Sequence, residues 1–229
     1  MKIGIVTANY NRIKVFRLWC ASIQRLRDNF GDIPTIVTSE KDDEGTCVDY
    51  NIIHHIKNNN YFSRKFNKSM LEMRKQDVDY VMVLGSDDIV SNDLFAKILN
   101  AAESNPDLIY ISNIYFYSPY LEKGLIKFVS ERNLGVCRTV SRRVLDKVDW
   151  MPWHGDRRKG LDADMMNNIR TYVKTMKRVD GMVVDVKGRF SMNKFSTWLN
   201  KVNKFEDEQE FLSILSEKEL MLLDKIRRV

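Results

Sequence analysis

The chain contains few of the residues that interrupt or cross-link a fold. It has only four prolines and ten glycines among 229 residues, which argues against long disordered linkers. Its three cysteines, Cys20, Cys47 and Cys137, lie far apart and form no CxxC pair, so neither a disulfide framework nor a zinc knuckle is supported. No stretch approaches the roughly 18 uninterrupted apolar residues that span a bilayer. We therefore expect a folded globular protein with reduced cysteines and no stable insertion into a membrane.

The first residues, MKIGIVTANYNR, also lack the pattern of a secretory signal. They turn polar at Thr7 and charged at Arg12 before an apolar core of export length can form. With 44% hydrophobic and 30% charged residues, the chain can form one sizeable core, or a domain with a modest appendage. We expect the protein to remain in a cytoplasm.

Basic residues are concentrated in one part of the chain. Residues 121–204 contain 19 Lys and Arg against 9 Asp and Glu, a surplus of ten positive charges, although the whole chain carries only +6. Such a surplus can be the solvated faces of helices. It can also meet an anionic partner such as a nucleotide phosphate, a nucleic acid or a membrane surface. The charge pattern alone leaves these interpretations open.

Strand and helix patterns alternate along the first hundred residues. The apolar or β-branched runs that indicate strands occupy residues 2–8, 32–40, 51–56 and 79–85. Apolar positions at helical spacing indicate helices over residues 15–27, 62–76 and 91–103. The alternation predicts an α/β fold with a mixed, mainly parallel sheet flanked by crossover helices.

Polar loops follow three of the four predicted strands. They are NYNR at residues 9–12, EKDDEG at residues 40–45 and SDD at residues 86–88. Because functional groups of such a sheet gather at the carboxyl ends of its strands, we expect these loops to lie side by side.

Asp87 and Asp88 follow an almost wholly apolar strand and allow two interpretations. Aspartate is common in turns, where its carboxylate accepts hydrogen bonds from nearby backbone amides. However, Ser91 or Asn92 already supplies a cap for the next helix. Two adjacent carboxylates repel each other unless a cation neutralises them, and Mg²⁺ or Mn²⁺ bound to a diphosphate would do so. The residues themselves leave turn and metal site about equally supported.

In series, these segments resemble the inverting GT-A glycosyltransferases of the family 2 type. IVTANYNR (residues 5–12) resembles their first strand and Pro-Thr-Tyr-Asn-Arg loop, and FNKSM (residues 66–70) resembles their Arg-Asn-x-Gly segment. VMVLGSDDIV (residues 81–90) resembles their fourth strand with its Asp-x-Asp-Asp signature. The resemblance extends over roughly residues 1–190. It implies a GT-A, Rossmann-like nucleotide-binding fold, a nucleotide-sugar donor, which we expect to be a UDP-sugar, and a divalent metal, Mn²⁺ or Mg²⁺.

The resemblance also implies which residues bind the donor and the metal. Asp87 and Asp88 would hold the metal, although Gly85 stands where the family has its first Asp, so one carboxylate fewer surrounds the ion. Residues 183–187, VVDVK, predict a strand, and the polar segment after it would close over the diphosphate. The donor-binding residues implied are Thr7, Asn9, Tyr10, Arg12, Glu40, Asp42, Lys65, Asn67, Ser86, Asp87, Asp88, Lys187 and Arg189.

GLDADMM (residues 160–166) resembles the segment of the family that carries the general base. In a direct displacement at sugar C1 the acceptor hydroxyl loses a proton as it attacks, and a carboxylate can take it. The candidate catalytic residues are Asp162 and Asp164, two residues apart at the start of a predicted helix, so we expect only one to point into the site and favour Asp162. The alternative role for Asp162 is that of an N-cap.

Trp153 and His154 precede this segment and are candidates for contacting the acceptor. A tryptophan can stack on a sugar or a base, or it can anchor its loop on the core. A loop histidine can contact an acceptor or simply be a surface group.

The last residues predict a helical extension. Residues 205–229 have the pattern of one or two amphipathic helices, with a capping box from Ser216 to Glu219. The apolar stripe of Leu220, Leu223 and Ile226 would pack on the domain or on a second subunit of a homo-oligomer. We expect a GT-A domain over residues 1–195 and the extension over residues 196–229.

The sequence therefore predicts a glycosyltransferase with an open acceptor. One hypothesis is a hydroxyl on a modified DNA base, as in some viral DNA-modifying transferases, which would act in the host cytoplasm; the basic region would then follow phosphates. The other is an acceptor glycan, as in the synthesis of surface polysaccharides. A nucleotidyltransferase remains an alternative, but it usually needs more metal carboxylates than Asp87 and Asp88 supply. A non-catalytic basic nucleic-acid-binding α/β protein would leave Asp162 unexplained.

Overall fold

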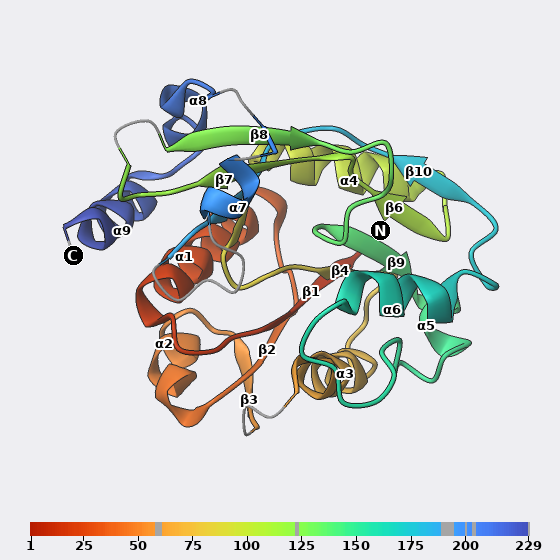
Figure 1. Ribbon diagram of the computed structural model, residues 1–229. Helices are drawn as coiled ribbons and strands as arrows, with labels where there is room; N and C mark the ends of the chain where they lie inside the picture. Colours follow the sequence, from red (N-terminus) through yellow and green to blue (C-terminus); the bar gives the residue numbers. More distant parts are fainter. Residues whose placement is uncertain (58–60, 122–123, 189–194, 200, 203–204, 229) are drawn as a thin grey trace.

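Two β-sheets with helices packed around them form the protein (Figure 1). The computed structural model describes residues 1–57, 61–121, 124–188, 195–199, 201–202 and 205–228.

The larger sheet has seven strands in the order β10-β6-β9-β4-β1-β2-β3. These strands are β1 (Ile3–Ala8), β2 (Thr35–Ser39), β3 (Ile53–Ile56), β4 (Tyr80–Val83), β6 (Leu108–Tyr110), β9 (Arg138–Ser141) and β10 (Met176–Arg178). The first four strands pair in parallel, as the sequence predicted, whereas β9 runs antiparallel to both β4 and β6. The chain adds β2 and β3 on one side of β1 and then returns to add β4 on the other.

The smaller sheet has four strands in the order β5-β11-β7-β8. They are β5 (Asp88–Val90), β7 (Asn113–Tyr117), β8 (Leu125–Val129) and β11 (Val183–Val186). β11 pairs antiparallel with β5 and parallel with β7. Asp88 was expected in the polar loop after the fourth strand, but it is the first residue of β5 and pairs with Asp185 of β11.

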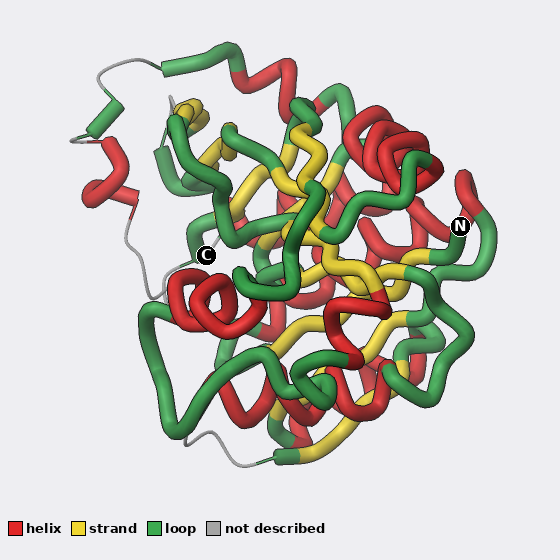
Figure 2. The backbone as a smooth tube through the Cα atoms, turned by 90° about the vertical axis from the view of Figure 1, so that its right-hand side faces the viewer, coloured by secondary structure: helices red, strands yellow, loops and turns green. Residues whose placement is uncertain are grey.

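Helices surround the two sheets. They are α1 (Ile13–Phe30), η1 (Lys41–Asp43), α2 (Glu44–Asp49), α3 (Phe62–Met73), α4 (Asn92–Glu103), α5 (Arg142–Asp146), α6 (Leu161–Ile169), α7 (Phe195–Leu199), α8 (Glu208–Leu212) and α9 (Glu217–Arg227). Seen from the side, the strands run through the middle of the molecule with helices around them (Figure 2).

Alternating side chains of the central strands explain this arrangement. In β1, Ile3 and Ile5 belong to one buried cluster, while Val6 and Ala8 belong to another. Successive side chains of a strand point to opposite faces, so a strand that is apolar throughout must be covered twice. The first cluster packs α1, α4 and the smaller sheet on one face, and the second packs α3, α5 and α6 on the other.

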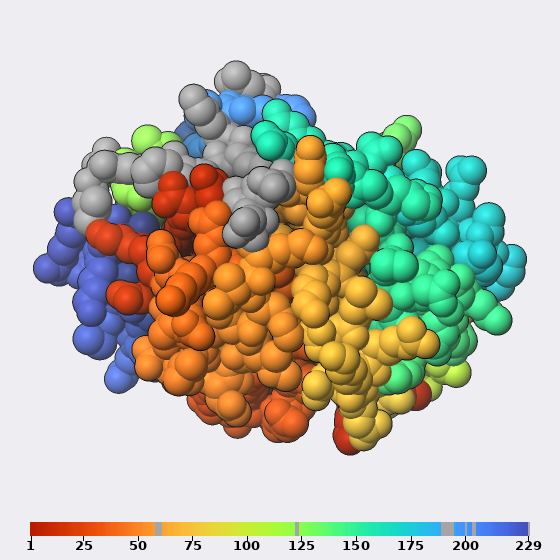
Figure 3. Space-filling view, turned by 90° about the horizontal axis from the view of Figure 1, so that it is seen from below, coloured from red at the N-terminus to blue at the C-terminus, as the bar shows by residue number. Residues whose placement is uncertain are grey.

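Two helix starts bear on function. Ser91 caps α4, its Oγ accepting the Leu94 N–H at 3.1 Å, as predicted. α6 begins at Leu161, so Asp162 and Asp164 both lie in its first turn. The segment before α6 lies beside α3 on the face shown in Figure 3, where Ser63 Oγ donates to the Gly155 carbonyl at 2.7 Å. Among the described residues, no helix has the length and apolar character needed to cross a membrane.

The C-terminal helix α9 packs along α1. It starts at the predicted capping box, in which the side chains and backbone groups of Ser216 and Glu219 bond reciprocally. Leu223 and Ile226 are buried against the rest of the chain, as expected for packing on the domain. The same expectation is wrong for Leu220, which is 39% exposed, because it projects from the outer face of the helix.

A buried ion pair anchors α9. Arg25 of α1 donates from Nε to Glu219 Oε2 at 2.9 Å, and both side chains are almost inaccessible to solvent. The same guanidinium donates to the Val90 carbonyl at 2.8 Å and to the Asn92 side chain. Arg25 therefore ties α9 to the end of β5 and the start of α4.

We predict that Glu219→Ala lowers the free energy of unfolding by about 3–5 kcal/mol, because it leaves a buried guanidinium without its carboxylate. Glu217→Ala is the matched control: it removes an exposed carboxylate from the same helical turn and should cost less than about 1 kcal/mol. Urea denaturation of both variants measures the difference. Equal losses would show that the ion pair does not anchor the helix.

Candidate active site

The loops after β1, β2 and β4 meet at the carboxyl end of the larger sheet. The strand order reverses between β1 and β4, and such a switch point opens a crevice in which α/β proteins bind ligands. Asn9 joins the three loops, because its Nδ2 donates to Asp43 Oδ2 at 2.9 Å and its Oδ1 accepts a bond from Ser86 Oγ at 2.8 Å. The loops therefore lie side by side, as the sequence predicted.

Three carboxylates gather beside this crevice. Asp87, Asp88 and Asp185 each offer an oxygen, and these atoms lie within 4.8 Å of one another. Asp87 lies in the turn between β4 and β5, Asp88 begins β5, and Asp185 faces Asp88 from β11. We call these three residues the carboxylate cluster. Asp185 was not predicted from the sequence, although a carboxylate inside the apolar run VVDV is a signal that could have identified it.

Gly85 makes room for the cluster. A Cβ atom at this position would lie 2.7 Å from Asp88 Oδ2 and 2.8 Å from Asp87 Oδ1, closer than atoms can approach without a shift. The Gly85 N–H donates to Asp88 Oδ2 at 2.6 Å. An aspartate at position 85 would require the Asp87 and Asp88 side chains to shift, and here the third carboxylate comes from Asp185 instead.

Two basic side chains pair with the cluster. The Arg12 guanidinium pairs with Asp87, and the Lys187 ammonium pairs with Asp185. Within the described part of the chain no basic side chain pairs with Asp88. Three carboxylates and two cations leave a net negative charge in a buried place.

Burial raises the pKa of two of these carboxyl groups. For Asp88, burial is the largest cause, and the nearby Asp185 and Asp87 raise the pKa further, well above the usual aspartate value. Burial, followed by Asp87, raises the pKa of Asp185 to about 7, although Lys187 opposes the change. Either protons or a bound cation must therefore neutralise the cluster.

The donor set fits a hard divalent cation. Carboxylate oxygens together with phosphate oxygens and water are the ligands that Mg²⁺ and Mn²⁺ prefer. The cluster supplies three such carboxylates, which fit the predicted metal better than the pair seen in the sequence. The identity of the metal stays a prediction.

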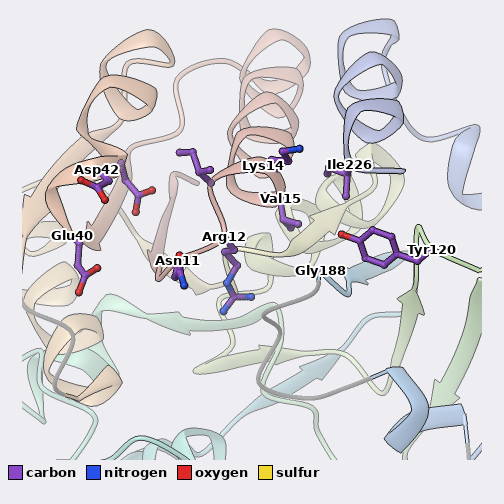
Figure 4. Close-up of a pocket in the computed structure, with 11 residues that line it drawn as sticks. Asn11, Arg12, Lys14, Val15, Glu40, Asp42, Tyr120, Gly188 and Ile226 are labelled. Atoms are coloured by element: carbon purple, nitrogen blue, oxygen red, sulfur yellow. The ribbon is translucent and has the colours of Figure 1, made fainter. Parts of the chain in front are cut away.

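Three cavities adjoin along the crevice, and we call this series, ordered by shared lining residues, the row of cavities. The outer cavity, of about 430 Å³, is shown in Figure 4, and the middle cavity, of about 130 Å³, shares Arg12 with it. The inner cavity, of about 250 Å³, shares Asp87 and Asp185 with the middle one. The outer cavity is lined by Asn11, Arg12, Ile13, Lys14, Val15, Glu40, Asp42, Asp43, Tyr120, Gly188 and Ile226. Arg12 and the carboxylate cluster thus mark the two junctions in the row.

Asp162 and Asp164 have different surroundings. Asp162 lines the inner cavity together with the carboxylate cluster. Its side chain occupies the space above Gly135, where a Cβ atom would lie 1.9 Å from Asp162 Cγ. Asp164 is buried, accepts the His154 N–H at 2.8 Å and pairs with Arg157 at 3.1 Å. Of the two candidates, Asp162 is the one placed where it could accept a proton, while Asp164 holds the preceding loop.

Three predicted donor residues, Thr7, Asn9 and Lys65, are completely buried and line none of the three cavities. Lys65 Nζ donates to the Asn9 carbonyl at 3.0 Å. Lys65 was expected to bind the donor, but its hydrogen bond to the Asn9 carbonyl supports the loop after β1 instead.

The predicted acceptor residues are also separated. Trp153 lines the inner cavity, packs on Phe66 with ring centroids 5.1 Å apart, and donates from Nε1 to the Leu161 carbonyl. The His154 side chain is 74% exposed and lies outside the three cavities. Asn67 donates to the Trp153 carbonyl at 2.7 Å, so it positions that loop.

The remaining predicted residues mostly lie along the row. Glu40 and Asp42 line the outer cavity, and Ser86 and Lys187 line the middle one. Tyr10 belongs to the loop that Lys65 supports and is 41% exposed, with Lys65 Nζ 5.7 Å from its ring centroid. Arg189 lies outside the described residues.

We predict that Mn²⁺ stabilises the protein more at pH 8 than at pH 5.5. The pKa of Asp185 is raised to about 7 in the fold, whereas an unfolded aspartate titrates near ~4. The folded metal-free protein therefore binds more protons than the unfolded chain between these values, and its free energy of unfolding falls as pH rises through this window. Mn²⁺ replaces these protons. At a concentration about 100 times its Kd, Mn²⁺ should raise the free energy of unfolding by about 2.7 kcal/mol.

Differential scanning calorimetry with and without Mn²⁺ measures this gain. Asp185→Asn should abolish most of it, while Asp180→Asn, an exposed carboxylate outside the cluster, should leave it unchanged. A gain that is independent of pH and survives Asp185→Asn would contradict the assignment.

Comparison with known proteins shows similarity in fold. No protein-family model matches the chain. No curated protein matches it. TarS residues 1–349 of S. aureus in complex with UDP-GlcNAc is 10% identical with a TM-score of 0.60, covering 99% of this chain and 71% of that chain. The mannosyltransferase PcManGT from Pyrobaculum calidifontis in complex with GDP-Man and Mn²⁺ is 11% identical with a TM-score of 0.56. The match covers 86% of this chain and 59% of that chain. The bifunctional IspDF from Campylobacter jejuni is 15% identical with a TM-score of 0.52, and the match covers 79% of this chain and 50% of that chain.

These similarities cover only part of the other proteins. The chain spans 60% of the TarS 1–349 chain in another structure and 37% of a longer TarS chain. At this level of identity the likeness concerns the fold alone. TarS and PcManGT are of the GT-A type, with the mixed α/β architecture described above, so the predicted fold class is confirmed. The chain therefore has the GT-A fold.

Proposed function

We propose that the protein transfers a sugar from a nucleotide-sugar donor to an acceptor hydroxyl, with inversion at the anomeric carbon. The observation that carries this proposal is the row of three cavities that crosses the carboxylate cluster and ends at Asp162. A nucleotide sugar has three parts in the same order: a nucleoside, a diphosphate and a sugar. The donor expected first is a UDP-sugar.

Each cavity has the chemistry of one part of such a donor. The outer cavity combines the apolar side chains of Val15 and Ile226 with the carboxylates Glu40 and Asp42, which suits the faces and the N–H or hydroxyl groups of a nucleoside. The middle cavity contains two cations and two carboxylates of the cluster, which suits a diphosphate. The inner cavity is walled by aromatic side chains and carboxylates, which suits a sugar ring. Its aromatic lining residues are Phe66, Phe116, Phe128, Trp153 and Trp198.

Arg12 and Lys187 would bind the leaving diphosphate. Both now pair with carboxylates at the edge of the middle cavity. A divalent cation held by Asp87, Asp88 and Asp185 would supply charge neutralisation for the diphosphate. The two basic side chains could then pair with phosphate oxygens and stabilise the charge that develops as the sugar departs.

Asp162 would act as the general base. The acceptor oxygen forms a bond to C1 while the bond from C1 to the diphosphate oxygen breaks, and the hydroxyl proton passes to the Asp162 carboxylate. Attack from the face opposite the leaving group inverts the anomeric configuration. Asp162 lines the inner cavity, where that face would lie.

Two structural neighbours support the donor class. TarS has been solved with UDP-GlcNAc and PcManGT with GDP-Man and Mn²⁺. These ligands belong to those proteins, and for this chain they favour a nucleotide sugar and a divalent metal without choosing the base.

We predict that Asp162→Asn lowers kcat by about 10²–10⁴-fold, because general base catalysis contributes a factor of this size. The Kd of the donor should stay within about twofold, since Asp162 belongs to the cavity farthest from the nucleoside. Single-turnover transfer and calorimetric titration with UDP measure the two quantities. Asp164→Asn should instead lower the melting temperature, because it releases His154 and Arg157. Unchanged kcat in Asp162→Asn would exclude its role.

The products separate sugar transfer from nucleotidyl transfer. The number of carboxylates no longer does so, because Asp185 adds a third one to the site. A glycosyltransferase releases a nucleoside diphosphate from a nucleotide sugar, whereas a nucleotidyltransferase releases pyrophosphate from a nucleoside triphosphate. Asp162 favours the first, since it places a carboxylate opposite the cluster.

We propose an anionic acceptor, with a modified base in DNA as the first candidate and a glycan as the second. The segment between Trp153 and Leu161, two residues that line the inner cavity, carries the exposed Arg157, Arg158 and Lys159. Arg158 and Arg64 lie 5.5 and 5.2 Å from the ring centroid of Tyr61. A polyanion following this basic rim would bring its hydroxyl to the inner cavity.

We expect labelled sugar to be transferred to hydroxymethylated DNA, and transfer to weaken steeply as salt rises, because phosphate contacts release counterions. Scintillation counting of precipitated DNA, with unmodified DNA as the control, measures this. Transfer to a neutral glycan but not to DNA would overturn the DNA hypothesis and leave the sugar-transfer proposal standing.

A further inference from the structure

The wall of the outer cavity is built from two distant parts of the chain. Glu40 and Asp42, from the loop after β2 and η1, lie on one side (Figure 4). Ile226 of α9 and Tyr120, which follows β7, lie on the other side. The C-terminal helix is therefore part of the wall of this cavity, although it was predicted from the sequence as an extension outside the main domain.

α9 is fixed at both ends. Near its start, Glu219 pairs with Arg25 at 2.9 Å in a buried position. Near its end, Arg227 Nε donates to Tyr117 Oη at 3.0 Å, and its guanidinium also pairs with Glu208. Burial and the bond to Glu208 raise the pKa of Tyr117 to about 12, so the phenol stays protonated and donates to Glu208. Ile226 is adjacent to the second anchor, and its position in the wall is accordingly well defined.

The two sides of the wall differ in chemistry. Val15 and Ile226 are apolar and only 4% and 2% exposed, and both line the cavity. Glu40 and Asp42 opposite accept hydrogen bonds. A heterocycle with N–H groups on its edge and apolar faces matches both sides. Arg12 at the inner end of the cavity leads from this position to the carboxylate cluster.

We propose that α9 forms a wall of the nucleoside pocket and that Ile226 is a specificity-determining residue for the base of the donor. This inference rests on the proposed function, since it assigns the outer cavity to the nucleoside. It has two consequences: shortening Ile226 weakens contact with the base, and binding of a nucleotide stabilises the docked position of α9. The second follows because a ligand that contacts only the docked helix favours that state.

Ile226→Ala and Leu223→Ala form a matched pair for the test. Both remove a buried aliphatic side chain from α9, but Leu223 does not line the outer cavity. Both variants should lose similar stability. Calorimetric titration with UDP and Mn²⁺ should show an approximately tenfold weaker Kd for Ile226→Ala alone, since even one methylene lost from an apolar pocket is worth about this much. Equal Kd values in the two variants, or a Kd unchanged from the wild type in both, would overturn the inference.

Hydrogen exchange of the wild-type protein provides a second measurement that needs no variant. Amides of α9 should exchange more slowly when UDP and Mn²⁺ are added than with Mn²⁺ alone, and unchanged exchange would contradict the proposal. If the wild type binds none of the four common nucleoside diphosphates, the proposed function and this inference both fail. If it binds UDP but α9 shows neither effect, only this inference fails.

Discussion

The site depends on one constraint: three carboxylates meet in a buried place where they cannot all remain charged alone. Burial and mutual repulsion raise the pKa of Asp88 and of Asp185, and the two nearby cations, Arg12 and Lys187, leave the group with a net negative charge. Burying uncompensated charge is unfavourable, so a purely structural core would not gather three carboxylates without a compensating partner. The cluster is explained when a divalent cation and the diphosphate it holds complete the charge balance, and the three cavities then receive the rest of the donor.

The architecture brings these groups together from two sheets. The switch point of the larger sheet supplies Arg12 and Asp87, while the antiparallel pair of β5 and β11 supplies Asp88 and Asp185. Arg25 connects the end of β5 and the start of α4 to Glu219 of α9, which lines the outer cavity through Ile226. Buried polar contacts therefore connect α9, the helix that carries Ile226, to the end of the strand that begins with Asp88.

Local patterns in the sequence predicted the first four strands, their helices, the caps at Ser91 and Ser216, and the meeting of the three polar loops. They could do so because hydrophobic period and capping chemistry are local. Asp185 was missed because its role arises only when β11 pairs with β5, a contact between distant segments. Lys65 and Asn67 were placed in the right region, but which way each side chain points depends on packing that no spacing rule contains. Position in the helix favoured Asp162 over Asp164, and the structure places Asp162 at the inner cavity and Asp164 in contact with the preceding loop; which of them is the base stays a prediction.

The central claim is that a nucleotide sugar lies along the row of cavities, with its diphosphate at the carboxylate cluster. A crystal structure with Mn²⁺ and a non-hydrolysable UDP-sugar, recorded at the manganese absorption edge, tests it most directly. The account predicts one anomalous peak, from a manganese ion coordinated by Asp87, Asp88 or Asp185 and by diphosphate oxygens. It places the uracil between Glu40 and Ile226. A nucleotide bound elsewhere, or a manganese peak away from all three carboxylates, would contradict it.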